Sequence, residues 1–308
     1  PHYPDISVFT DVNGYIFPIG ENQGLSLYFE ANDINIAFVQ KYMKAFSSDV
    51  KGRGGGKIHL YGSFSDIFLK CTPYVKNGNI KINLLNTTYS FSDTIVMDST
   101  SIRANNTIVS DKDGNSGILN LDFRHENFRD LKYDLDIKAD KMLVYDVAER
   151  INPQIFGQVY ASGTAKINGT EDYITVEGNV RSETGTTAGF NFMDNSTVEN
   201  YDFITFVEKP EDKTHRSKNE NTPKEQGDNK DDSPMDYQLN FLVDVTPDAK
   251  LEFTMDASSG DKIRGSGNGN IQVQYGSQGD MQMFGSYLIS EGTYNFSLQQ
   301  VIRKRFNI

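Results

Sequence analysis

The sequence predicts an all-β protein: an elongated, mostly antiparallel open sheet or β-solenoid, with one short N-terminal helix. Three observations support this fold class. Apolar and polar residues alternate with a period of two along most of the 308 residues. No apolar run is longer than about four residues, whereas strands buried on both faces have continuous apolar runs. Helical periodicity is scarce, so each strand is expected to have one apolar and one solvated face.

The alternating segments follow one another from about residue 57 to the C-terminus. Successive side chains of a strand point to opposite faces, so the apolar members of each segment share one face. Sequence alone leaves open whether these faces fill a closed sandwich core or line an open trough. The candidate lining residues are Ile58, Leu60, Ile80, Ile82, Leu84, Leu119, Leu121, Phe123, Ile174, Val176, Leu239, Phe241, Val243, Leu251, Phe253, Met255, Ile271, Val273, Met281, Met283, Tyr294, Phe296 and Leu298.

Two segments show helical spacing. The first is Ile34–Phe46, where Phe38, Tyr42 and Phe46 recur every four residues and are expected to share one helix face. The second, weaker candidate is Leu143–Ile151, which ends before an Asn-Pro pair. The glycines that follow the first helix are expected to end it and to lead into a hairpin.

The chain divides into N-terminal strands and the helix (residues 1–49) and a β-trough (residues 50–308). Within the trough, Glu208–Pro234 has no apolar residue, so burial cannot offset its ordering entropy and we expect a disordered loop. Strand-like patterns at Tyr201–Val207 and Tyr237–Val245 flank this segment, which predicts that it interrupts a hairpin.

A repeated pattern occurs three times: a glycine, a short gap, an alternating strand and another glycine. Gly52, Gly157 and Gly265 mark equivalent points, 105 and 108 positions apart. This spacing indicates the same sheet pattern laid down several times along one axis.

The composition excludes several classes of function. The 30 basic and 42 acidic residues give a formal charge of −12, which disfavours nucleic-acid binding because no basic excess can release counterions. The single cysteine, Cys71, excludes an internal disulfide and a multi-cysteine zinc site, and we expect it to be a small buried residue. The chain opens on Pro1, without a signal peptide or transmembrane stretch, as expected of a soluble segment of a longer protein.

Catalytic motifs are not apparent, and we expect neither enzymatic activity nor a cofactor. The glycines of residues 52–56 follow a helix, whereas a nucleotide-binding loop precedes one. Arg124-His125-Glu126 could supply a general base, but an exposed polar strand end is the simpler interpretation.

One loop imitates a calcium site. Asp111, Asp113, Asn115 and Asp122 occupy ligand positions one, three, five and twelve of such a loop. The sixth position is Ser116 in place of the required glycine, and the twelfth lacks the longer glutamate. Asp-Gly and Asn-Ser-Gly are also ordinary turn sequences, so a turn between two strands is the favoured interpretation.

The C-terminal stretch MFGSYLISEGTYNFSLQQVIRKRFNI resembles the end of the TamB family, the AsmA-like translocation and assembly module proteins, in its Bacteroidetes-type form. YSFSDTIVMD, IFGQVYASGTAKING and GDKIRGSGNGNIQVQY also resemble this family, and they stand in the family's order, so we expect the likeness to run from about Val50 onward. The positions that match the terminal motif are Gly292, Tyr294, Phe296, Lys304, Phe306 and Ile308.

The resemblance implies a periplasmic protein whose full-length parent is anchored in the inner membrane. It also implies that the sheet is curved into a U-shaped trough with an apolar interior. This trough would offer phospholipid acyl chains a path between the two membranes and would support outer-membrane protein assembly with an Omp85/BamA-type barrel partner. The alternative is an extracellular or surface β-solenoid that binds glycans or serves as an adhesin-like module. That alternative calls for exposed aromatic ladders, whereas most Phe and Tyr residues fall on the apolar faces and Trp is absent.

Overall fold

The computed structural model describes residues 9–19, 23–43, 47–126, 129–170, 172–192, 236–256, 260–277, 281–298 and 302–308. Within these residues the fold is all-β, with one short 3₁₀ helix, η1 (Ile36–Tyr42). The strands are β1 (Phe9–Phe17), β2 (Gly24–Asn35), β3 (Ser47–Gly62), β4 (Ile67–Cys71), β5 (Tyr74–Ile82), β6 (Thr87–Thr94), β7 (Val96–Met97), β8 (Ser101–Ser110), β9 (Ser116–Glu126), β10 (Arg129–Val147), β11 (Ile155–Thr170), β12 (Tyr173–Ser182), β13 (Thr187–Asn191), β14 (Asp236–Val245), β15 (Lys250–Asp256), β16 (Asp261–Gly276), β17 (Gln282–Leu298) and β18 (Ile302–Asn307).

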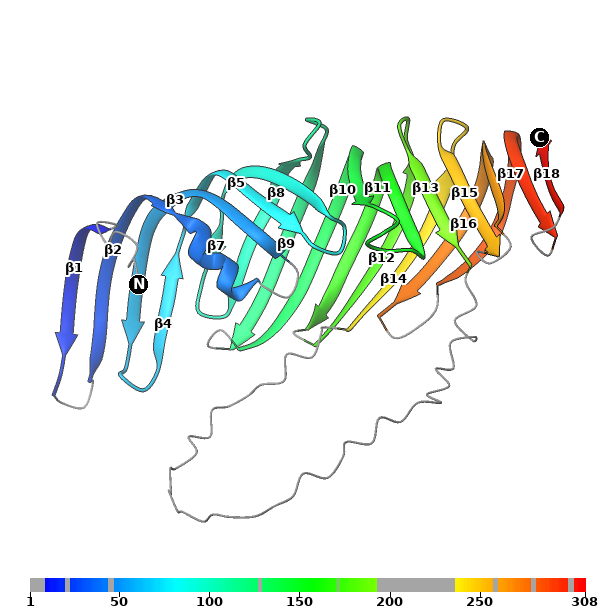
Figure 1. Cartoon of the computed structure of the whole chain (residues 1–308). Coiled ribbons are helices and arrows are strands. Elements are labelled where there is room, and N and C mark those ends of the chain that lie inside the picture. The colour runs from blue at the N-terminus through cyan, green and yellow to red at the C-terminus, as the bar shows by residue number, and fades with distance from the viewer. Residues whose placement is uncertain are drawn as a thin grey trace, which may run out of the picture. The chain divides into compact units, whose positions relative to one another are not determined.

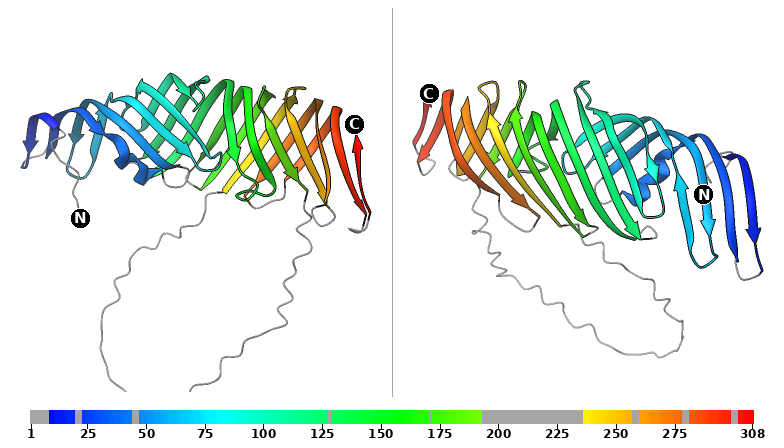
Figure 2. Two further views of the ribbon diagram at one scale, coloured as in Figure 1. Left: turned by 45° about the horizontal axis from the view of Figure 1, so that its top comes forward. Right: turned by 180° about the vertical axis from the view of Figure 1, so that it is seen from behind.

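All of these strands belong to one sheet and follow one another in chain order, except where two short strands share one long neighbour (Figure 1). The same succession is visible from two further sides in Figure 2. The pairs are antiparallel except for two, β12 with β14 and β13 with β15. The prediction of an all-β, mostly antiparallel sheet is therefore confirmed.

Three long strands each pair with two short ones on the same side. β3 pairs with β4 and β5, β11 with β12 and β13, and β16 with β14 and β15. Each long strand has 16 residues, and each carries one of the three repeated glycine segments. The repeat seen in the sequence thus corresponds to a repeated structural role.

The expectation of a hairpin around residues 208–234 is wrong. β14 starts beside the start of β12 and runs parallel to it, with Tyr173 opposite Asp236. β16 pairs with the other side of β14, so both sides of this strand are paired with strands other than Tyr201–Val207. Alternation with a period of two does not encode strand direction, which is why the sequence pattern missed this. Glu208–Pro234 and Tyr201–Val207 themselves lie outside the described residues.

β-Bulges interrupt the interior of several strands, and three of them share one local design. In each, a residue with φ between 50° and 56° donates its backbone N–H to the side chain of the residue opposite. Such bulges bend a strand and increase its twist. The three donor–acceptor pairs are Asn77 with Ser92 Oγ (3.0 Å), Asn106 with Asn120 Oδ1 (2.8 Å) and Lys141 with Ser162 Oγ (2.9 Å).

The helix predictions need correction. The first helix is a 3₁₀ helix of seven residues, and it buries Ile36 while Phe38 is 53% exposed. The glycines at residues 52–56 lie inside β3 and so do not end the helix. The second predicted helix does not form, because residues 143–147 continue strand β10 and a turn follows.

Acid is expected to weaken the turn between β7 and β8. The backbone N–H of Thr100 donates to the Asp98 carboxylate, as do the N–H and hydroxyl of Ser101, and these bonds lower the pKa of Asp98 to about 2. A lowered folded-state pKa stabilises the protein above the unfolded value of about 3.9, and this contribution is lost as the pH falls towards 2. We expect the melting-temperature difference between wild type and Asp98→Ala to be largest at pH 7 and to shrink by pH 2.5. Asp134→Ala, on the exposed face of β10, is the control and should show no such pH dependence. A melting-temperature difference between wild type and Asp98→Ala that stays constant with pH would contradict this account.

Candidate functional site

One face of the sheet carries apolar residues in rows that cross strand after strand. The strand registers place these residues directly opposite one another from β9 to β17. The first row is Leu119, Ile137, Ala165, Gly178, Phe241, Val273 and Met283. The second row is Leu121, Leu135, Ile167, Val176, Leu239 and Tyr275. Together the two rows form a continuous apolar surface, here called the apolar face.

β10 also contributes to the apolar face, although its residues are not among those predicted from the sequence. Tyr133, Leu135 and Ile137 alternate strictly with charged residues and pair with candidates on β9. The Tyr133 ring meets the Phe123 ring edge-on at 5.0 Å. The period of two in this segment was sufficient to identify these residues.

The short strands β12 and β14 carry the rows described above, and the short strands β13 and β15 carry a further apolar row. The turns β12–β13 and β14–β15 separate the two sets of rows and are here called the bend. Phe190 and Phe253 lie opposite each other with ring centroids 5.6 Å apart, and Phe253 also meets Tyr287 at 5.9 Å. The row is Ile155, Phe190, Phe253, Ile263, Tyr294 and Phe306. It includes the predicted residues Phe253 and Tyr294.

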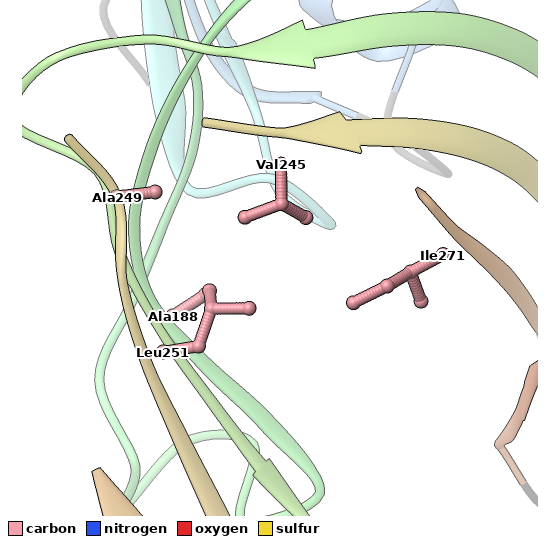
Figure 3. Close-up of a cluster of buried hydrophobic side chains, with 5 residues drawn as sticks. All are labelled: Ala188, Val245, Ala249, Leu251 and Ile271. Carbon is pink, nitrogen blue, oxygen red and sulfur yellow. The ribbon is translucent and has the colours of Figure 1, made fainter. Parts of the chain in front are cut away.

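The two sets of rows meet in a buried cluster at the bend (Figure 3). Val245 comes from β14 and Leu251 from β15, on either side of the turn that contains the fully buried Ala249. Figure 3 shows these side chains, with those of Ala188 and Ile271, directed towards a common interior. Both halves of the bent strands therefore turn their apolar faces towards each other.

Burial decreases with distance from this cluster. Val245 and Leu251 are about 5% exposed, whereas Phe241 and Phe253 are only half-buried. Met255, predicted to line the same face, lies at a register shift in β15 and is 51% exposed. A closed sandwich core would bury residues along the whole length of both strands. This gradient favours a groove, closed near the cluster and open towards the strand ends, over a closed core.

Most of the predicted lining residues are half-buried on the apolar face. Leu251 and Ile271 are fully buried in the cluster, and the side chain of Leu298 is outside the described part of the chain. Leu84 does not alternate with the strand as expected, because it lies 40% exposed in the turn between β5 and β6. The half-buried candidates are Ile58, Leu60, Ile80, Ile82, Leu119, Leu121, Phe123, Ile174, Val176, Leu239, Phe241, Val243, Phe253, Val273, Met281, Met283, Tyr294 and Phe296.

Phe241 lies flat on the floor of this groove. A Cβ atom added to Gly178, its partner on β12, would come within 2.4 Å of the Phe241 ring carbons. The ring therefore rests on bare backbone in place of a side chain. The absence of a side chain at Gly178 thus leaves room for the Phe241 ring in the first row.

The two faces differ in polarity, although exposed apolar side chains such as Leu242 and Phe284 also lie on the second face. Burial raises the pKa of Tyr145 and of Tyr237 to about 12, and the Tyr145 hydroxyl donates to the carbonyl of Ile155 at 2.7 Å. On the opposite face, exposed ion pairs cross between strands, such as Lys166 with Asp136 at 3.6 Å. Such exposed pairs add little stability, but they keep that face solvated.

The polar face also has features that could suit a glycan. A shallow depression of about 680 Å³ is lined mainly by amides and charged groups, among them Asn120, Asn240 and Gln272. On β2 and β3, the rings of Tyr28 and His59 stack at 4.1 Å. The His59 ring also stacks on Tyr61 at 4.7 Å, so both of its faces are covered, whereas the Tyr28 side chain remains 53% exposed.

The residues that imitate a calcium loop have other partners. Asp111 accepts N–H groups of Asp113, Asn115 and Leu143 at 2.7–2.9 Å, which is the arrangement of an Asx turn. Asp122, the supposed twelfth ligand, bonds Arg124. Among the residues that the structure describes, no group of three or more His, Cys, Asp or Glu residues is placed to hold a metal ion.

His125 is not the exposed strand end that the sequence suggested. It is 3% exposed at the end of β9, and this burial lowers its pKa. Its backbone N–H donates to the carbonyl of Thr100. Cys71 is buried, as expected.

The fold and the apolar face define a class: β-sheet proteins that present a continuous apolar surface across many strands. The TamB C-terminal domain family model matches residues 105–308, about two thirds of the chain, and the chain therefore belongs to the TamB family. This match begins in β8, later than the expected Val50, and covers the rows described above. Members of the family are transport and assembly modules of the cell envelope and not enzymes. Searches of curated proteins and of solved structures found no match.

Within the described segments, helices long and apolar enough to cross a membrane do not occur.

Proposed function

We propose that this chain binds phospholipid acyl chains along its apolar face and passes them between the inner and outer membranes. The observation that carries the proposal is the width of the apolar surface, which continues across seven strands while most of its side chains remain half-buried. Each methylene group that leaves water for such a surface contributes roughly 0.8 kcal/mol. Head groups can remain in solvent at the open side of the groove.

Membership of the TamB family supports a proposal for the cellular setting. We place the chain in the periplasm, within a longer parent anchored in the inner membrane, where it supports outer-membrane protein assembly. An Omp85/BamA-type barrel is the proposed protein partner of the full-length protein. These proposals rest on membership of the TamB family and on the groove's suitability for lipid.

A pair of neighbouring substitutions on β14 tests lipid binding. Phe241 points into the groove and Leu242, 52% exposed, points to the polar face, so Asp can be introduced on either side of one strand. We expect Phe241→Asp to reduce co-purifying phospholipid, measured by mass spectrometry after expression in bacteria, at least tenfold. Leu242→Asp should leave lipid content unchanged.

Melting temperatures separate a groove from a closed core. An Asp in an open groove stays hydrated, whereas in a closed core it loses its water and costs several kcal/mol. Phe241→Asp, and likewise Phe253→Asp and Val273→Asp, should therefore remain folded. Unfolding of all three would indicate a packed core, and full lipid retention in stable variants would remove these residues from the path.

A further inference from the structure

The 3₁₀ helix η1 lies on the apolar face of the N-terminal strands, where it crosses in front of the sheet (Figure 1). Its Ile36 forms a buried cluster with Val50 of β3 and Val75 of β5. The half-buried residues Val39, Met43, Ile80, Phe91 and Ile95 pack around this cluster.

The surface beneath η1 belongs to the candidate groove. From Val50 to Leu60, β3 pairs without inserting an extra residue, so its even-numbered residues share one face. That face carries Val50 under the helix and the predicted lining residues Ile58 and Leu60 further along. The helix therefore rests on the same kind of surface that we propose for acyl chains.

Two glycines on β3 leave space for the side chain of Ile36. A Cβ added at Gly52 would lie 3.1 Å from Ile36 Cδ1, and one added at Gly54 would lie 2.9 Å from Ile36 Cγ2. Glycine weakens a strand interior, and its presence there is typical of places where another group approaches the backbone closely. The glycine-rich segment of β3 is thus shaped to receive the side chain of Ile36.

The helix is held by few polar contacts. The Asn35 side chain accepts the N–H of Ala37 at 2.9 Å, and the Gln40 side chain donates to the carbonyl of Ser48. A 3₁₀ helix of seven residues has poor hydrogen-bond geometry and little stability of its own. Its position depends mainly on apolar contacts, which an acyl chain could replace.

We infer that η1 occupies the groove in place of an acyl chain and closes its N-terminal section until lipid displaces it. This inference rests on the proposed lipid-binding function. Ile36, Val39 and Met43 present aliphatic groups to the apolar face, as a lipid tail would. Exchange of one apolar occupant for another leaves the buried area nearly unchanged, so differential lipid affinity can shift the population between closed and open states.

Photo-crosslinking at two positions tests this. A photoreactive amino acid replaces Phe91, beneath the helix, or Val273, in the first row of the apolar face, and the protein is exposed to phosphatidylethanolamine vesicles. Ile36→Asp releases the helix, and Phe38→Asp is the matched control on its exposed side. We expect Ile36→Asp to increase lipid crosslinks at position 91 at least threefold and to leave those at position 273 unchanged, while Phe38→Asp changes neither.

A second variant guards against a local folding defect. Replacing residues 36–42 with seven Gly and Ser residues should give the same increase at position 91. Crosslinks at 273 without an increase at 91 in either variant would overturn the inference and leave the proposed function standing. Loss of the β-sheet circular dichroism signal in both variants would also overturn it, because η1 would then be an indispensable core element. Absence of lipid at 273 in the wild type would overturn the proposed function and, with it, this inference.

Discussion

Replacing Gly157 with alanine is expected to lower the free energy of unfolding by about 3 kcal/mol. Gly157 has a φ of +123°, and an added Cβ would lie 2.1 Å from the carbonyl oxygen of Thr187 on the neighbouring strand. Residues other than glycine cost about 1–2 kcal/mol at positive φ, and forced contacts in a packed region add about 1–3 kcal/mol. Because the obstructing atom belongs to the backbone, the pairing of β11 with β13 must shift to relieve it.

Urea unfolding monitored by circular dichroism measures this effect. Gly276→Ala, at the end of β16, is the control, since its Cβ would come only within 3.3 Å of one carbonyl and its φ is unstrained. We expect the control to remain within about 1 kcal/mol of wild type. Equal stability of the two variants would refute the role assigned to Gly157.

Asp111→Ala is the second substitution with a large expected effect, also about 3 kcal/mol. The carboxylate accepts the buried N–H of Leu143 at 2.7 Å, besides the N–H groups of Asp113 and Asn115. Removing an acceptor leaves a buried donor unsatisfied, which costs about 1–3 kcal/mol, and bonds to a charged group add to that loss. Leu143 is itself 1% exposed, so water does not replace the missing partner readily.

The effect of this substitution should depend on pH. Burial alone would raise the pKa of Asp111, but the N–H donors of Leu143, Asn115 and Asp113 outweigh it, so the pKa lies below its usual value. The stabilisation is therefore complete above the unfolded-state pKa and is lost as the pH falls through the folded one. Thermal melts of wild type and Asp111→Ala should differ most near pH 7 and converge in acid. Asp113→Ala, which removes only the exposed bond to the Tyr160 hydroxyl, should change little at any pH.

The strands were predictable because alternation is a local property of the sequence. Leu239, Phe241 and Val243 alternate with residues of the polar face, and the structure places all three on the apolar face. The same pattern does not distinguish a covered face from an uncovered one. The open groove near Phe241 and Phe253 depends on the angle between two halves of bent strands, which local periodicity does not encode.

The helices were less predictable, for reasons that lie elsewhere in the chain. Four-residue spacing placed Phe38, Tyr42 and Phe46 on one helix face. In the structure the buried residue of the helix is Ile36, whose side chain packs against the glycines of β3. In β10, register shifts next to Met142 and between Leu143 and Tyr145 bury two consecutive residues. The resulting apolar run no longer alternates, which made a strand resemble a helix.

The parallel pairing of β12 with β14 has a consequence for the order of folding. Gly169 and Ile174, paired across a hairpin, are 5 positions apart, whereas Tyr173 and Asp236 are 63 apart. Loop-closure entropy makes the longer connection costlier by about 2 kcal/mol. The strands β1–β13 pair with one another over short sequence distances, and so do the strands β14–β18. Only the pairs β12–β14 and β13–β15 join the two groups. The protein is thus expected to assemble as two independently formed halves, and their docking along β12–β14 and β13–β15 completes the sheet last.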